Sequence, residues 1–223
     1  MNWRLAAGAI GALSTLVVAQ PVAAVSTQPG FQAQQVFAGL DRPVAVSFAP
    51  DGRAFVAEKG GRLKVFPRVP GVGEAAIQAS SAPTFVDLSA SVHDEWDRGP
   101  LGVAASPSWP TDRRVYVLYT RDARHGLTGG WGDGCPTPPG PTADGCVVDA
   151  RLARLTAQGG DSNQSSGAED VLTDGWCDQF SSHSAGTLLF GPTARSTQAL
   201  EMGRASREPT SGRSGGAQVR RSR

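Results

Sequence analysis

Short apolar runs separated by turn residues recur along the chain. In residues 43–58 two such runs flank Pro50-Asp51-Gly52, and strand-like sequence on both sides of an Asp-Gly turn predicts a β-hairpin. A second pair of runs, residues 101–107 and 115–120, has a longer connection. Residues 150–155 alternate apolar and charged side chains, which predicts a half-exposed strand that completes the unit begun at residue 101.

A third unit begins near residue 183 and lacks its second half. His183 precedes the apolar run Thr187–Phe190, which ends at Gly191-Pro192 and predicts a buried strand entered from a loop. From Thr193 onward no apolar run offers that strand a partner. Repeated short strands with turn signals indicate an all-β fold, and a partial β-propeller of about two to three blades fits best because its loops can grow without disturbing the packing.

The N-terminal residues 1–24 predict a secretory signal peptide. They hold one positive residue, Arg4, then an apolar stretch from Leu5 to Ala19, and small residues around a cleavage point after Ala24. A membrane anchor is the alternative, but a span needs about 20 apolar residues and Gln20-Pro21 interrupts the run. We therefore expect a secreted or extracytoplasmic protein with no stable membrane insertion after cleavage, a linker at residues 25–35, and the incomplete propeller at residues 36–192.

The formal net charge of +1 conceals two oppositely charged regions. Residues 193–223 carry seven arginines against two glutamates, a local charge of +5, which leaves −4 for residues 1–192. A basic tail on an acidic body is compatible with a nucleic-acid partner. We expect none, for the reason given below for the tail.

The expected export bears on how the three cysteines are interpreted, because disulfides form in an oxidising compartment. Cys135 and Cys146 bracket a Pro/Gly-rich loop, and a disulfide between them would stabilise it by about 3 kcal/mol in the chain-entropy model. Cys177 is then left unpaired. Zinc is a weak alternative because no C-x-x-C pair is present and the histidines are scattered. Asp133, Asp144 and Asp149 lack an EF-hand pattern, so solvated turn carboxylates are the better interpretation than a calcium site.

These motifs, taken in order, resemble the glucose/sorbosone dehydrogenase family. The residues that carry the resemblance are Leu40–Pro43, Pro50–Gly52, Val56–Glu58, Gly61–Leu63, Arg98–Ala104, Val115–Thr120, His183–Gly186 and Leu189–Pro192. The chain departs from the family pattern at Pro100 and Ser106, both structural positions. The resemblance implies a secreted six-bladed propeller that oxidises sugars with pyrroloquinoline quinone (PQQ) and calcium.

The resemblance assigns one catalytic residue to this chain. His183 begins the H-x-x-G segment and is implied to be the general base that takes the proton of the sugar's anomeric hydroxyl, a role that suits an imidazole with a pKa near ~6.5. A loop histidine with a structural hydrogen bond is the alternative. The family's PQQ-holding cations and calcium ligands belong to later blades, so we expect this chain to bind neither group and to be inactive as it stands.

Residues 193–223 form an Arg-rich tail that we expect to be disordered. If one base was lost just before the codon of Thr193, the restored codons permit Asp-Gly-Ala-Leu-Tyr-Ala-Ser-Ala-Gly-Asp-Gly, the missing half of the third hairpin. The same shift permits a Cys at Gly216-Ala217, a lost partner for Cys177. We therefore interpret the tail as out-of-frame translation of GC-rich DNA; a genuine disordered basic tail is the alternative.

Two other function classes remain open at this point. A non-catalytic secreted propeller could bind carbohydrate or protein through its loop face. A propeller lactonase or other metal hydrolase would need a convergent cluster of carboxylate and Asn side chains, which the sequence does not reveal.

Overall fold

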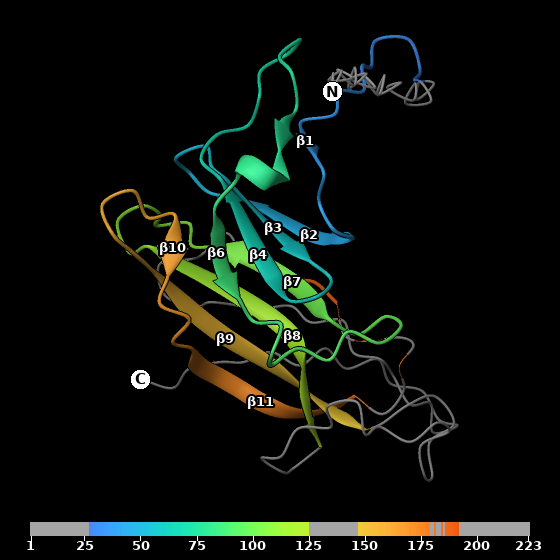
Figure 1. The fold of residues 1–223 in the computed structure, drawn as a ribbon, viewed down its shortest axis with the longest axis vertical. Coiled ribbons are helices and arrows are strands. Elements are labelled where there is room, and N and C mark those ends of the chain that lie inside the picture. Colours follow the sequence, from blue (N-terminus) through green and yellow to red (C-terminus); the bar gives the residue numbers. More distant parts are fainter. Residues whose placement is uncertain (1–26, 125–146, 179–180, 182–183, 185, 192–223) are drawn as a thin grey trace, which may run out of the picture. The chain divides into compact units, whose positions relative to one another are not determined.

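The computed structural model describes residues 27–124, 147–178, 181, 184 and 186–191 (Figure 1). The chain separates into two units, residues 1–34 and 35–223. In the described part of the first, the Thr27 hydroxyl donates a hydrogen bond to the Phe31 carbonyl at 2.9 Å. Within the described residues no helix is long and apolar enough to cross a bilayer. The expected signal helix and the expected disordered tail lie outside these residues and stay predictions.

In the described residues the second unit is built from strands of two to eleven residues and one 3₁₀ turn. Its elements are β1 (Phe37–Ala38), β2 (Pro43–Phe48), β3 (Ala54–Glu58), β4 (Arg62–Phe66), β5 (Ile77–Gln78), η1 (Ala79–Ser81), β6 (Thr84–Asp87), β7 (Pro100–Ala105), β8 (Arg114–Arg124), β9 (Val148–Gln158), β10 (Gln164–Ser165) and β11 (Asp170–Asp178). β1 and β5 form a small parallel pair, and the other strands form two antiparallel sheets. The predicted all-β class is confirmed.

The first sheet has the strand order β2-β3-β4-β6. The predicted hairpin is confirmed, since Val46 pairs with Val56 and Phe48 with Ala54. Its turn closes with a 3.0 Å hydrogen bond from the Gly52 N–H to the Ala49 carbonyl. Gly52 has a φ of +88°, which glycine adopts at no steric cost.

The second sheet has the order β7-β8-β9, with β11 and β10 both pairing with β9. The predicted pairing of residues 101–107 with 115–120 and the added strand at 150–155 are confirmed. After β9 the chain turns back at residues 159–163, and Gln164 and Ser165 pair with Gln158 and Ala157. β11 has no clear alternation in its sequence, and register shifts interrupt its pairing with β9.

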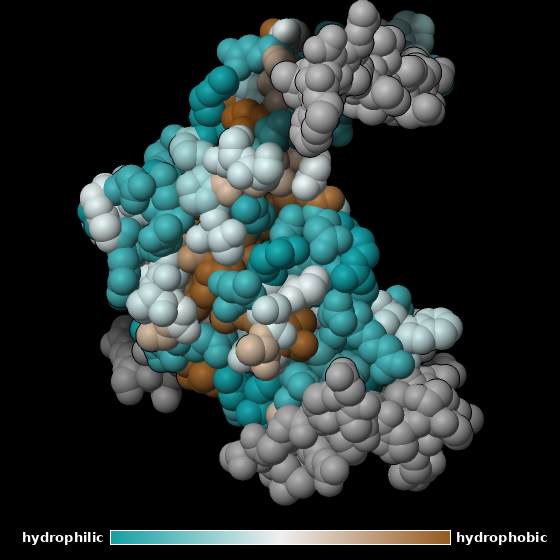
Figure 2. Space-filling view, in the orientation of Figure 1, coloured by the Kyte–Doolittle hydropathy of each residue, from teal (hydrophilic) through white to brown (hydrophobic). Residues whose placement is uncertain are grey.

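The two sheets pack face to face and share one apolar core. Alternation decides which side chains enter it: Phe55 and Ala57 on β3 face the second sheet, whereas Ala54 and Val56 face a separate cluster with η1. Phe55 packs edge-on against Phe85 and Trp109, with ring centroids 5.1 and 5.2 Å apart. Figure 2 shows a mostly hydrophilic surface on which apolar side chains appear in separate small patches.

The outer face of the second sheet is covered by residues 186–191. Leu188 is buried there against Tyr116, Leu118 and Leu152, and the ring of Phe190 meets that of Tyr116 edge-on at 5.2 Å. The strand predicted at Thr187–Phe190 is wrong: the segment alternates its side chains as a strand would, but no strand is assigned there. Within the described residues no strand pairs with it, so the backbone ladder is missing.

At the turn end of the first hairpin, Arg53 connects the two sheets. Its Nη1 donates to the carbonyls of Asp161 and Ser162, both at 3.1 Å, and its Nε pairs with Asp51 at 2.8 Å. The Trp109 indole N–H donates to the same Asp51 carboxylate at 2.8 Å. These bonds fix the spacing of the sheets at the end opposite to the site described next.

Candidate functional site

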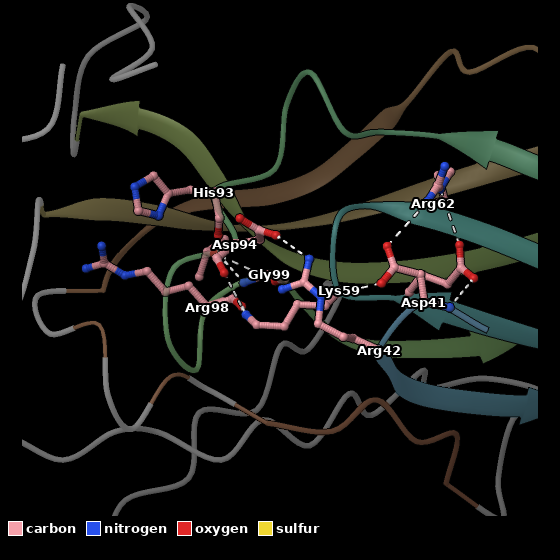
Figure 3. Close-up of polar contacts among 10 residues, drawn as sticks. Asp41, Arg42, Lys59, Arg62, His93, Asp94, Arg98 and Gly99 are labelled. Atoms are coloured by element: carbon pink, nitrogen blue, oxygen red, sulfur yellow. Dashed lines mark hydrogen bonds and ion pairs between the residues drawn. The ribbon is translucent and has the colours of Figure 1, made fainter. Parts of the chain in front are cut away.

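Polar side chains gather at the end of the two sheets where β2 begins, β3 gives way to β4, and β6 connects to β7. Figure 3 shows this group, which draws on residues 41–42, the turn at 58–62 and the loop at 93–99. The end of β11 and residue 181 contact the same loop, and the Ser184 hydroxyl bonds to Asp178 at the end of β11. Segments far apart in sequence therefore converge near Ser184.

The outer part of the group is a network of ion pairs that are exposed except at Glu58. Arg42 pairs with Asp94 at 3.3 Å, and Arg62 pairs with Asp41 at 3.4 Å and with Glu58 at 3.3 Å. The buried Glu58 carboxylate also accepts the N–H of Asp41 at 2.8 Å. Exposed pairs of this kind add little stability individually, so their main effect is to fix the loop geometry.

Lys59 connects the first sheet to the loop at 93–99. Its Nζ donates to the carbonyl of Asp94 at 2.7 Å and to that of Arg98. Burial lowers the pKa of Lys59, and the nearby Asp94 carboxylate opposes that effect. The loop approaches so closely that a Cβ on Gly99 would lie 3.0 Å from the Lys59 carbonyl oxygen, and Gly99 has a φ of +123°. Glycine is therefore required at this contact.

The buried part of the group centres on Arg98, whose side chain is 0% exposed. Its Nη2 donates to the backbone carbonyl of Asp178 at 2.8 Å, and its Nε lies 3.5 Å from the Asp178 carboxylate. Burial raises the pKa of Asp178, although the Ser184 hydroxyl and the Arg98 charge act in the opposite direction. Burial likewise lowers the pKa of Arg98, from a value high enough that the guanidinium stays charged. Truncating one member of such a pair costs about 3–5 kcal/mol.

Two further contacts attach the chain on either side of residue 183. The Ser184 hydroxyl donates to Asp178 Oδ2 at 2.9 Å, and the Asp97 N–H donates to the Ser181 carbonyl at 3.0 Å. Asp178 therefore joins Arg98 to Ser184. The loop at 93–99 holds this part of the chain by both side-chain and backbone bonds.

His93 is buried next to this pair. Burial lowers its pKa, and the charge of Arg98 lowers it further. Among the described residues its Nδ1 has no hydrogen-bond partner, and neither Nη1 nor Nε of Arg98 has one. In Figure 3 the side chains of His93 and Arg98 extend away from the Asp41–Arg62 group. The Thr120 hydroxyl donates to the His93 carbonyl at 2.7 Å and accepts the Gly99 N–H at 2.7 Å, which fixes the loop to β8.

The residues singled out by sequence lie mostly outside the described part. His183, Cys135 and Cys146 are among the undescribed residues, so the general base and the disulfide stay predictions. Cys177 lies exposed on β11. The interpretation of Asp149 as a solvated turn carboxylate is wrong. Asp149 is buried on β9 and pairs with Arg121 at 3.0 Å.

The described residues do not fit PQQ or its calcium ion. Among them no group of three or more His, Cys, Asp or Glu side chains could hold a metal ion. The cations at this end are already engaged: Arg42 and Arg62 with carboxylates, Lys59 with carbonyls, and Arg98 with Asp178. A quinone tricarboxylate needs cations that are not so occupied.

Sequence reasoning missed Arg98, Asp178 and Ser184 as a linked set. Arg98 and Ser184 entered only as parts of family motifs, and Asp178 was not singled out. The one local signal was an arginine between Asp97 and Gly99, at the entry to an apolar strand. A charged residue there is ordinary on a surface loop, and only the fold shows that this one is buried.

Comparisons with known proteins agree with this architecture. The sequence model of the family "Glucose / Sorbosone dehydrogenase" matches residues 40–193, more than half of the chain. No curated protein sequence matches. Among solved structures, the PQQ-bound aldose sugar dehydrogenase of Streptomyces coelicolor is 18% identical, with a TM-score of 0.50 over 76% of this chain and 40% of that one.

A Thermus thermophilus protein described as an oxidoreductase of the glucose dehydrogenase type is 26% identical, with a TM-score of 0.48. The match covers 72% of this chain and 37% of that one. The chain thus spans less than half the length of either structure. The likeness to the Streptomyces structure supports the fold, and the family match extends over both sheets to residue 193. This chain belongs to the glucose/sorbosone dehydrogenase family.

Proposed function

We propose that this chain is part of a secreted, PQQ-dependent aldose dehydrogenase of the glucose/sorbosone type. The observation that carries the proposal is the family match over residues 40–193, which includes the H-x-x-G segment at His183. The polar group at 41–99 and 178–184 supports it, because bonds within that group hold the chain on both sides of this histidine.

His183 is proposed as the general base. A neutral imidazole with a pKa near ~6.5 can accept the proton of a sugar's anomeric hydroxyl at neutral pH. In the family PQQ accepts the hydride. Because the described residues do not fit PQQ or calcium, we assign no step of the reaction to a bound quinone here.

The chain alone is proposed to be inactive. It spans 37% and 40% of the two solved structures above, and Arg42, Arg62, Lys59 and Arg98 at the candidate site are engaged by carboxylates and carbonyls. The quinone and calcium sites would then come from sequence that the tail at 193–223 replaces. Reading the gene across the codons of Gly191 and Pro192 tests this: an open frame that encodes further blades is expected downstream.

The activity test compares the 223-residue chain with the protein encoded by the restored frame. With PQQ, calcium and an electron-accepting dye, the restored protein should oxidise glucose or another aldose, and His183→Asn should lower kcat by about 10²–10⁴-fold, the usual contribution of a general base. The 223-residue chain should show no turnover and no saturable PQQ binding.

Either of two results would contradict the proposal. Turnover by the 223-residue chain would show that it needs no further blades. A restored protein that passes no electrons from any sugar to PQQ would favour the alternative function, a non-catalytic secreted propeller that binds carbohydrate or protein through its loop face.

A further inference from the structure

We propose that Arg98 is a positioning residue: through Asp178 and Ser184 its buried guanidinium holds the chain on both sides of His183. The inference rests on the proposed function in one respect only, which is that His183 acts as the general base. Arg98 reaches Asp178 twice, with Nη2 2.8 Å from its carbonyl and Nε 3.5 Å from its carboxylate. Asp178 in turn accepts the Ser184 hydroxyl at 2.9 Å.

Arg98 can position a neighbour because its own backbone is fixed from two sides. Lys59 Nζ, from the β3–β4 turn, donates to the carbonyls of Asp94 and Arg98. On the other side, the Thr120 hydroxyl on β8 accepts the Gly99 N–H at 2.7 Å. The loop is therefore anchored to both sheets before it contacts residues 178–184.

The far side of the same segment is fixed independently. A Cβ on Gly102 of β7 would lie 3.0 Å from the Leu188 nitrogen and 3.3 Å from the Gly186 oxygen. Leu188 is buried against the second sheet. The short stretch between Ser184 and Leu188 is thus held at one end by a polar bond and at the other by close packing.

The contact calls for arginine in particular. The planar guanidinium lets Arg98 donate a hydrogen bond to the Asp178 carbonyl through Nη2 while its charge pairs with the Asp178 carboxylate. A lysine could keep the charge or the hydrogen bond, and methionine neither. If Arg98 has a positioning role, protection of residues 181–190 from hydrogen exchange should be greatest with arginine at position 98, lower with lysine and lowest with methionine.

The test uses the full 223-residue chain and needs neither PQQ nor sugar. Hydrogen exchange is measured in a peptide covering residues 181–190, with a peptide covering 54–66 as internal reference, and the imidazole signal of His183 is recorded by NMR. In Arg98→Met we expect exchange at 181–190 to be at least about 10-fold faster, the reference peptide to be unchanged, and the His183 shift to move toward that of a free histidine. Arg98→Lys should restore part of both.

Arg151→Met is the matched control. Arg151 pairs with Glu169 at 3.3 Å and with Asp174 at 3.2 Å, so its loss also removes ion pairs in the second sheet. Among the described contacts of Arg151 none is to Ser181 or Ser184. Equal effects of Arg98→Met and Arg151→Met on the 181–190 peptide and on His183 would mean that Arg98 only stabilises the fold, and would overturn the proposal.

If Arg98→Met does not fold, Ser184→Ala still tests the proposal. It removes one partly buried hydroxyl, and we expect faster exchange at 184–190 with an unchanged melting temperature; no change would overturn the proposal. An inactive restored enzyme in which Arg98→Met still loosens 181–190 would instead contradict the proposed function and leave this inference standing.

Discussion

Gly102 and Gly60 differ in the space available for a side chain. A Cβ on Gly102 would lie 3.0 Å from the Leu188 nitrogen, 3.1 Å from Leu188 Cγ and 3.3 Å from the Gly186 oxygen, whereas a Cβ on Gly60 would meet nothing within 4 Å. Two of the three atoms near Gly102 belong to backbone, which cannot rotate away. Gly102 is therefore required by what lies over it rather than by its own conformation.

Gly102→Ala should lower the free energy of unfolding by about 1–3 kcal/mol, the usual cost of overpacking, because residues 186–188 must move outward. Urea denaturation measures the change, and faster hydrogen exchange at 186–190 should accompany it. Gly60→Ala is the matched control and should be close to neutral. A neutral Gly102→Ala would show that the covering segment is not held where the structure places it.

His93 predicts a pH dependence of stability. Its pKa is lowered from 6.5 by burial and then by Arg98, while Asp122, Glu95 and Asp94 act in the opposite direction. The unfolded chain therefore binds the proton first as the pH falls, so stability present above about pH 6.5 is lost progressively below it.

Melting temperatures at pH 7.5 and 5.5 measure this effect. The wild-type chain should lose more stability between these values than His93→Gln, which carries no titrating group at that position. Parallel decreases in the two proteins would show that His93 is not the group responsible.

At the scale of elements, β2 presents apolar side chains to solvent. Val44, Val46 and Phe48 alternate along it and are 45%, 51% and 60% exposed, while Ala45 between them packs on the core. Within the described residues β2 pairs only with β3, so it is an edge strand with an apolar face. Such edges promote association between chains.

The double substitution Val46→Thr with Phe48→Thr should reduce self-association, because threonine keeps the strand preference and removes the apolar surface. Light scattering at increasing protein concentration measures the effect, and stability should change by no more than about 0.5 kcal/mol per site. Val72→Thr, at a residue 86% exposed outside the strands, is the control and should leave association unchanged. Equal scattering by all three proteins would exclude β2 as the associating surface.

Local sequence predicts some of these elements and not others, for a physical reason. The hairpin at 43–58 carries its own turn at Pro50-Asp51-Gly52, from which the register between Phe48–Ala54 and Ala45–Ala57 follows. β11 depends on β9, from which residues 159–169 separate it in sequence, and the register shifts twice along the pair. Asp149 differs from its prediction for a similar reason, since its partner Arg121 comes from another strand and only the pairing of β8 with β9 brings them together.

At the scale of the whole chain, the family could be recognised from ordered motifs, whereas the linked set at Arg98 could not. Each motif is a continuous stretch of residues, and the order of the motifs along the chain can be compared directly with that of the family. The bonds of Arg98 to Asp178 and of Asp97 to Ser181 join residues about 80 positions apart, and no local pattern encodes them. The two sheets share one core, yet the first keeps its apolar β2 face and, within the described residues, the second is covered by residues 186–191.

The covering segment at 187–190 has a consequence for whatever strand comes to pair with it. Leu188 and Phe190 pack against the second sheet and Leu189, which is 58% exposed, points away from it, so the side chains of this segment already alternate as those of a strand do. A strand that paired with it would have to place its own apolar side chains on the same face, because a register shift of one residue would turn them to solvent.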